Sequence, residues 1–278
     1  IFYFQQWKIK TKEYIMKEKE KLPFGTDEWC SKTTNIISGC EHDCKYCYAK
    51  AIAVRFKRKT PLDWKEEILN EKYLDKRFPK VEGRVMYPST HDITPFNLQY
   101  SLQHLNNILY SGNEVLIVTK PHLGVVESIC EVFKNYKDKI LFRFTIGSTN
   151  NEVLKFWEPG APDYQERKSA LIYAYEKGFQ TSLSCEPMLD DNVEDIVADL
   201  QDYITETIWV GKMNFLKGRL KMNGYSDSIT IQKANELLAM QSDDRIVDLV
   251  ERLKDNPKIH WKESIKKVLN SKNELLKL

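Results

Sequence analysis

The sequence predicts an α/β protein with a parallel β-sheet, because short strand-like runs alternate with longer helical segments along most of the chain. The run 114–120 is rich in β-branched residues and is stopped by Pro121. The segment 162–178 has Pro162 near its start and Gly178 at its end, as helices do. Other helices are expected at 96–110, 125–136 and 192–200. Six strands are expected, at 33–38, 84–90, 114–120, 140–148, 179–186 and 207–213.

Each expected strand ends in a cluster of polar residues. In parallel α/β sheets the carboxyl ends of the strands share one edge, and ligands bind there. We therefore expect several of these clusters to form one functional site. The clusters are Ser38-Gly39-Cys40, Ser89-Thr90-His91-Asp92, Thr119-Lys120, Gly147-Ser148-Thr149-Asn150, Ser184-Cys185-Glu186 and Gly211-Lys212.

The composition is typical of a globular protein, with 42% hydrophobic and 29% charged residues in a chain of 278. A net charge of +2 excludes a generally cationic nucleic-acid coat but not a local basic groove. Residues 1–80 hold 18 basic and 12 acidic side chains, so the N-terminal third is basic. No apolar run reaches the length of a membrane span, and the N-terminus lacks the apolar stretch of a signal peptide. We therefore expect a cytoplasmic protein that does not act at a membrane.

Three of the six cysteines, Cys40, Cys44 and Cys47, have the spacing C-x3-C-x2-C. Such a tight cluster in a chain of this size indicates a metal rather than a disulfide framework. Structural zinc takes four ligands, and His42 could supply the fourth only from an awkward place inside the loop. Three thiolates with an open position suit an iron–sulfur cluster. The alternatives are a zinc site or three unrelated buried cysteines. The remaining cysteines are Cys30, Cys130 and Cys185.

This cysteine spacing resembles the signature of the radical S-adenosylmethionine (SAM) superfamily. The resemblance implies that Cys40, Cys44 and Cys47 hold a [4Fe–4S] cluster whose open iron chelates SAM. It also implies that a flavodoxin- or ferredoxin-type donor reduces the cluster, and that SAM is then cleaved to a 5′-deoxyadenosyl radical that takes hydrogen from a substrate. The implied fold is a partial (β/α)6 TIM-like barrel, which agrees with the six expected strands.

Several segments are similar to one branch of that superfamily, which contains spore photoproduct lyase and the DNA repair photolyase-like proteins. The resemblance spans about residues 33–270, and it extends to phage-encoded radical SAM proteins of unknown substrate. The similar segments are Gly39 to Ala49, Ser89 to Pro95, Val118-Thr119-Lys120, Trp157 to Arg167, Ser184-Cys185-Glu186-Pro187 and Trp209-Val210-Gly211.

The resemblance implies SAM contacts at several strand ends. Tyr48 would pack on the adenine, unless it is simply part of the core. Ser89 and Thr90 would receive the ammonium group, and Lys120 would pair with the carboxylate. Glu158 and Arg167 would reach SAM or pair with each other. Further candidate cofactor contacts are Ser148, Asn150 and Glu186.

The same branch implies catalytic roles for two tyrosines and a thiol. Tyr46 and Tyr48 occupy the positions of two tyrosines that relay a hydrogen atom in spore photoproduct lyase. Ser89 stands where that lyase has a cysteine hydrogen donor, and an O–H bond is much stronger than an S–H bond. Cys185 is therefore the candidate thiol donor, and a small buried core residue is the alternative reading.

The substrate is less well defined. His91 and Asp92 are candidate substrate contacts, or they belong to a satisfied loop network. Arg55, Lys57 and Arg58 form a basic run that suits DNA, RNA or nucleotide binding, or else a solvated helix end. Three functions remain: a radical SAM enzyme acting on nucleic acid or nucleotide, one acting on a peptide or small molecule, and a non-catalytic iron–sulfur or zinc module.

Three regions are expected along the chain. Residues 1–32 form an N-terminal extension, 33–230 the partial barrel, and 231–278 a C-terminal helical extension that closes the open side of the barrel or packs beneath it.

Overall fold

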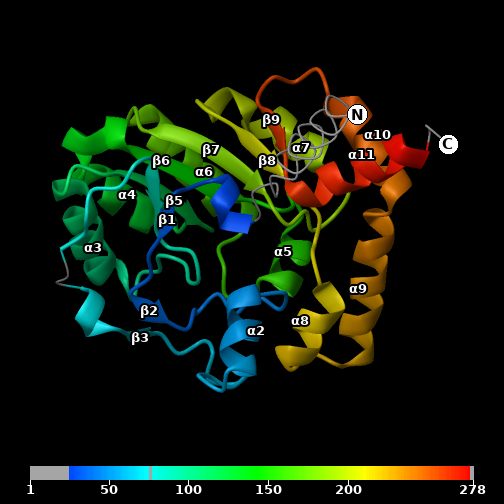
Figure 1. Ribbon diagram of the computed structural model, residues 1–278, viewed down its shortest axis with the longest axis horizontal. Helices are drawn as coiled ribbons and strands as arrows, with labels where there is room; N and C mark the ends of the chain where they lie inside the picture. The colour runs from blue at the N-terminus through cyan, green and yellow to red at the C-terminus, as the bar shows by residue number, and fades with distance from the viewer. Residues whose placement is uncertain (1–24, 75–76, 276–278) are drawn as a thin grey trace, which may run out of the picture.

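The computed structural model describes residues 25–74 and 77–275. Seven parallel strands form a curled half-barrel sheet in the order β1-β4-β5-β6-β7-β8-β9 (Figure 1). This confirms the predicted partial barrel. The strands are β1 (Lys32–Thr33), β4 (Arg84–Met86), β5 (Glu114–Thr119), β6 (Ile140–Thr145), β7 (Gln180–Cys185), β8 (Ile208–Val210) and β9 (Ile259–Trp261).

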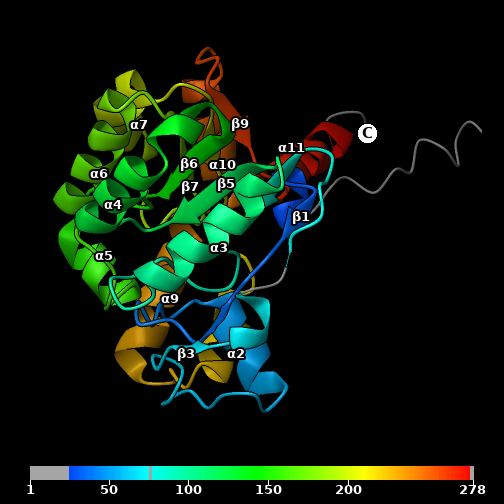
Figure 2. The ribbon, with the colours of Figure 1, turned by 90° about the vertical axis from the view of Figure 1, so that its left-hand side faces the viewer.

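Helices follow most of the strands, and Figure 2 shows α3, α4, α6 and α7 together on one face of the sheet. The α-helices are α2 (Tyr48–Arg55), α3 (Leu98–Tyr110), α4 (Leu123–Val132), α5 (Asn151–Trp157), α6 (Tyr164–Glu176), α7 (Val193–Leu200), α8 (Leu216–Met222), α9 (Ser228–Met240), α10 (Asp243–Leu253) and α11 (Glu263–Leu275). The 3-10 turns are η1 (Gly25–Glu28), η2 (Glu71–Tyr73), η3 (Lys134–Lys139) and η4 (Gln201–Tyr203).

The main hydrophobic core lies between the sheet and these helices. All six residues of β6 are buried, as expected of a central parallel strand covered on both faces. Helix α3 directs Leu105, Ile108 and Leu109 into the core at helical spacing. Each fully buried side chain of this size contributes about 1.5–3 kcal/mol, so the central strands and their helices hold the rigid part of the molecule.

The first two expected strands are shorter in the structure. The segment 33–38 is divided into β1 and β2 (Ile37–Ser38), and β2 pairs antiparallel with β3 (Ile68–Leu69) outside the main sheet. The segment 84–90 leaves the sheet after Met86, because Pro88 has no amide hydrogen for a strand ladder. The residues after Met86 are thereby released to form the polar turn at the carboxyl edge.

The C-terminal residues contain a strand as well as the expected helices. β9 pairs with β8 through Ile208 and Ile259 and through Trp209 and His260, and it forms an edge of the sheet. β9 therefore extends the half-barrel, whereas we expected only helices in 231–278. Near the other end of the chain, η1, which belongs to the expected extension 1–32, lies close to the carboxyl ends of the strands. Within the described residues, the helices are all too short or too polar to cross a membrane.

Candidate functional site

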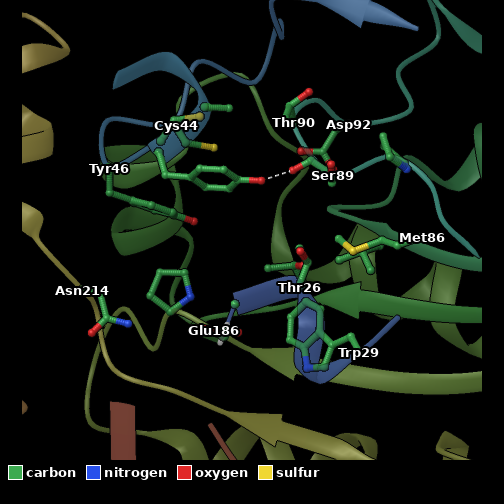
Figure 3. A pocket seen from close by; sticks show the side chains of 18 of the residues that line it. Thr26, Trp29, Cys44, Tyr46, Met86, Ser89, Thr90, Asp92, Glu186 and Asn214 are labelled. Carbon is green, nitrogen blue, oxygen red and sulfur yellow. Dashed lines mark hydrogen bonds between the residues drawn. The ribbon is translucent and has the colours of Figure 1, made fainter. Parts of the chain in front are cut away.

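A cavity of about 440 Å³ lies at the carboxyl edge of the sheet (Figure 3). This volume is in the usual range for small-molecule and cofactor pockets. Cys44 and Tyr46 lie on one side of the cavity, Ser89, Thr90 and Asp92 on another. Several of the polar clusters at the strand ends therefore line the same cavity, as expected.

The loop before α2 carries the three clustered cysteines into this cavity. Gly39 has φ +103°, and a Cβ atom there would lie 2.2 Å from the carbonyl oxygen of Glu66. The amide of Cys40 donates to the carbonyl of Trp64 at 3.0 Å. At Gly160, a Cβ atom would lie 2.2 Å from the carbonyl oxygen of Glu41. Both glycines are therefore required for the close backbone contacts that fix the loop.

Cys40, Cys44 and Cys47 are free thiols, and all three line the cavity. Burial raises the pKa of each thiol, and the pKa of Cys40 is raised further by Asp92 and by the two neighbouring cysteines. The three side chains thus share one wall of the same cavity. A cationic centre is the partner that stabilises such thiolates, so the donor set fits an iron–sulfur cluster.

Asn35 holds the turn that forms the next part of the wall. Its Oδ1 accepts the amides of Ser89 at 2.8 Å and Thr90 at 2.9 Å, and its Nδ2 donates to Ser89 Oγ at 2.8 Å. The Tyr48 hydroxyl donates to the carbonyl oxygen of Ser89. Ser89 and Thr90 line the cavity as expected, with their amides already occupied. Tyr48 closes the gap between the cysteine loop and this turn.

Asp92 belongs to a satisfied loop network. Its carboxylate accepts from His42 Nδ1 at 3.0 Å, and from the Thr119 hydroxyl at 2.9 Å and the Lys120 amide at 2.7 Å. Burial alone would raise the pKa of Asp92, but Lys120 and His42 hold it well below its usual range. The Lys120 ammonium, 3.7 Å from Asp92, also lines the cavity. An ionised Asp92 therefore orients the His42 ring and lies beside the Lys120 ammonium group.

His91 has free hydrogen-bonding capacity on the cavity wall. Its Nδ1 lies 2.9 Å from the carbonyl oxygen of Asp92, and its Nε2 is buried with no partner among the described residues. Burial lowers the pKa of His91 to about 4, so the ring is neutral at neutral pH. A neutral ring with one committed nitrogen can still bind a ligand through the other.

Tyr46, Glu158 and Arg167 form a buried chain behind the cysteine loop. The Tyr46 hydroxyl donates to Glu158, and Arg167 Nη1 lies 2.7 Å from the same carboxylate. Burial alone would raise the pKa of Glu158, but Arg167 and Lys120 lower it. Glu158 and Arg167 thus pair with each other, the second of the two arrangements we expected, and Tyr46 alone of the three lines the cavity within the described chain.

Three expected site residues lie elsewhere in the structure. Cys185 is fully buried in the main hydrophobic core, because strand alternation directs it away from the cavity that Glu186 lines. The Ser148 hydroxyl donates to Asp190. Asn150 is the N-cap of α5 and accepts from the Glu152 amide at 2.8 Å. For the described residues, the cavity wall does not include Cys185, Ser148 or Asn150, so the structure does not place these three candidates beside the residues that line it.

The basic run is exposed at the end of α2. The guanidinium groups of Arg55 and Arg58 lie 5.8 Å and 5.3 Å from the centre of the exposed Phe56 ring. Lys57, with φ +55°, is also exposed. In the described part of the chain these side chains lie outside the cavity wall, so the structure brings them near the cysteine loop but not into the site.

Several cavity residues were missed because they come from the two expected extensions. Glu28 ends η1 and Trp29 follows it, whereas Lys262 follows β9. Lys262 Nζ lies 2.7 Å from Glu28 Oε1, 3.5 Å from Glu186 Oε2 and 4.2 Å from the centre of the Trp29 ring. Burial raises the pKa of Glu186, and Lys262 opposes this shift. A buried lysine therefore joins both ends of the chain to the predicted site residue Glu186.

The chain resembles proteins of a virus and an archaeon. It is 27% identical over 200 residues to an uncharacterized protein of Acidianus two-tailed virus, covering 67% of this chain and 65% of that protein. It is 26% identical over 204 residues to an uncharacterized protein of Methanocaldococcus jannaschii, covering 70% and 76% respectively. The chain thus spans just under two thirds of the viral relative's length.

Two solved structures share the fold. A tyrosine-to-phenylalanine variant of spore photoproduct lyase aligns with a TM-score of 0.55 and 16% identity, covering 87% of this chain and 79% of the lyase. Streptococcus suis SuiB bound to the precursor peptide SuiA aligns with a TM-score of 0.52 and 12% identity, covering 98% and 56%. The family model described as "Radical SAM superfamily" matches residues 34–203, which is more than half of the chain. The chain therefore belongs to the radical SAM superfamily.

Proposed function

We propose that this chain is a radical SAM enzyme in which Cys40, Cys44 and Cys47 ligate a [4Fe–4S] cluster. The observation that carries the proposal is the convergence of these three free thiols on one cavity at the carboxyl edge of the sheet. The superfamily uses a [4Fe–4S] cluster and SAM. When bound, such a cluster supplies the electron that cleaves SAM to a radical able to abstract hydrogen from a substrate.

The surrounding side chains bind and orient SAM in this proposal. Lys120 pairs with its carboxylate. Burial alone would lower the pKa of Lys120, but Cys44, Tyr46 and Asp92 raise it well above its usual range, so the side chain is cationic. The Ser89 carbonyl and the Thr90 hydroxyl accept from the SAM ammonium group. Tyr48 lies between these groups and the cysteine loop, where its ring can cover the adenine.

An anaerobic turnover assay tests this proposal. Protein reconstituted with iron and sulfide, then mixed with dithionite and SAM, is expected to form 5′-deoxyadenosine, measured by liquid chromatography. Protein without iron serves as the control. Retention of zinc alone, with no 5′-deoxyadenosine formed, would support the alternative of a non-catalytic zinc module and refute the enzyme.

We infer further that the substrate is a nucleic acid. Helices α2 and α8 pack against each other (Figure 1), and Asn223 at the end of α8 donates to the carbonyls of Lys45 and Cys47 at 2.9 Å. Arg219 of α8 lines the cavity, with its guanidinium 5.9 Å from the Tyr48 ring centre. Basic side chains interleaved with exposed aromatic rings suit phosphate contact and base stacking. The exposed residues of this α2–α8 surface are Arg55, Phe56, Lys57, Arg58, Phe215, Lys217 and Lys221.

Replacement of Lys57 and Arg58 by alanine is expected to weaken nucleic-acid binding and to reduce its salt dependence. Loss of two phosphate contacts lowers the slope of log K against log salt by about 2 for duplex DNA. Fluorescence anisotropy with labelled single- and double-stranded DNA and RNA, at several salt concentrations, measures both effects. The double variant Lys134→Ala/Lys254→Ala removes the same charge from two other exposed sites and should bind like the wild type. Wild-type binding that is indifferent to salt would contradict this substrate class and favour a peptide or small molecule.

A further inference from the structure

A pair of histidines lies outside the cavity, next to the cysteine loop. His42, between Cys40 and Cys44, is completely buried, whereas His122 is the partly exposed N-cap of α4. Their Nε2 atoms face each other at 3.0 Å. Among the described residues, the wall of the cavity includes neither histidine, so this pair is separate from the proposed SAM site.

The second nitrogen of each ring faces a carboxylate. His42 Nδ1 lies 3.0 Å from Asp92 Oδ2, and His122 Nδ1 lies 3.5 Å from Glu166 Oε1. Glu166 is held by the amide of Leu123 at 3.1 Å. Since an ionised carboxylate only accepts hydrogen bonds, the contact with Asp92 places the ring proton of His42 on Nδ1. Nε2 of His42 then presents a lone pair toward Nε2 of His122, where it can accept a hydrogen bond or bind a metal ion.

A third acceptor converges on the same point. Glu41 Oε1 lies 3.9 Å from His122 Nε2, and the ligand atoms of Glu41, His42 and His122 are all within 4.8 Å of one another. A hydrogen bond between the two rings would use both nitrogens but would not involve the Glu41 carboxylate. A metal ion satisfies all three atoms, because ligands of tetrahedral zinc lie about 3.3 Å apart at Zn–N distances of about 2.0–2.1 Å.

We propose that Glu41, His42 and His122 form a binding site for a divalent transition-metal ion, with zinc as the ion that best suits this ligand set. Asp92 and Glu166 orient the two histidines, which is the carboxylate–histidine–metal arrangement of known metal sites. Glu41 is 40% exposed and His122 19%, so the ion can enter from solvent. The site would tie the cysteine loop, through His42, to the start of α4.

A second group with suitable spacing, Cys40, His42 and Asp92, does not compete well for this ion. Asp92 already accepts three hydrogen bonds, and His42 uses Nδ1 to reach it. Cys40 lines the SAM cavity rather than the outer surface. The ligand atoms around a bound ion therefore distinguish the two groups, since the group with Cys40 contains sulfur and the group with Glu41 does not.

Zinc binding to the full-length protein with its iron–sulfur cluster tests the proposal. After incubation with zinc and extensive dialysis, one zinc per chain is expected by plasma mass spectrometry. X-ray absorption at the zinc edge should show only nitrogen and oxygen neighbours. His122→Ala should lose the zinc, and Glu166→Gln should weaken its affinity about 10–100-fold, as expected for a residue that orients a ligand. His260→Ala, which replaces an exposed histidine of β9, should keep the wild-type zinc content.

Circular dichroism and iron content verify that His122→Ala is folded before its zinc is compared. Equal zinc in the wild type and His122→Ala would overturn the proposal, as would sulfur in the zinc coordination shell. Wild-type protein that retains no zinc would also overturn it and would leave a hydrogen bond between the two rings as the reason for their close approach. These results are independent of SAM cleavage, so they do not depend on the proposed enzyme activity.

Discussion

Cys44→Ala is expected to abolish SAM cleavage while preserving the fold. The cluster requires three thiolates from one loop, and the cavity wall of the described residues has no fourth cysteine to replace the lost ligand. Cys44 is buried, but the substitution removes one sulfur atom from the cavity wall, so it should lower the free energy of unfolding by only about 1 kcal/mol. Iron and sulfide content after anaerobic reconstitution, and 5′-deoxyadenosine formed with dithionite, are the measurements.

Cys130→Ala is the matched control for that experiment. Cys130 is also a free, buried cysteine, but it lies on α4 in the main hydrophobic core. It should retain full iron content and product formation. The assignment would be refuted if Cys44→Ala kept its iron and its product, and loss of both in Cys130→Ala would show that the assay reports folding rather than ligation.

The central sheet and the cysteine loop could be predicted because their signals are local. β5 and β6 are short runs dominated by apolar residues, and the loop carries its ligands within eight residues. For these strands and this loop, the spacing and type of residue were sufficient. The need for glycine at positions 39 and 160, by contrast, appears only when their packing partners are known.

The far wall of the cavity could not be predicted in this way. Lys262 and Glu28 are neighbours only because β9 joins the sheet beside β8, and a three-residue strand gives no periodicity to detect. The position of Cys185 depends on a finer point: adjacent strand residues face opposite sides, and Glu186 rather than Cys185 lines the cavity. By contrast, the sequence could have predicted Asn150 as an N-cap, because asparagine is favoured at that position and α5 begins directly after it.

Arg167→Met is expected to destabilise the protein by about 3–5 kcal/mol at neutral pH. Arg167 and Glu158 both have fully buried side chains, so the substitution would leave a carboxylate with neither water nor its ion-pair partner. It would also remove the hydrogen bonds from Arg167 to the carbonyls of Pro162 and Thr145. Urea unfolding measures the effect. Arg245→Met, which breaks the exposed pair with Asp191, should cost less than about 1 kcal/mol.

The pH dependence distinguishes loss of the ion pair from loss of packing. In the wild type the pKa of Glu158 is lowered by Arg167 and Lys120 against the effect of burial, so its ionised form stabilises the fold above the ordinary glutamate pKa, and this contribution is lost as pH falls. In Arg167→Met burial prevails and the Glu158 pKa rises. The loss of stability relative to the wild type should then shrink toward pH 4, where Glu158 of the variant is protonated in both the folded and the unfolded protein. The double variant Arg167→Met/Glu158→Gln should recover part of the stability at pH 7. If Arg167→Met loses the same free energy of unfolding at pH 4 and pH 7, and the double variant recovers none of it, the loss comes from packing. The buried Glu158–Arg167 ion pair would then not contribute to holding the cysteine loop in place.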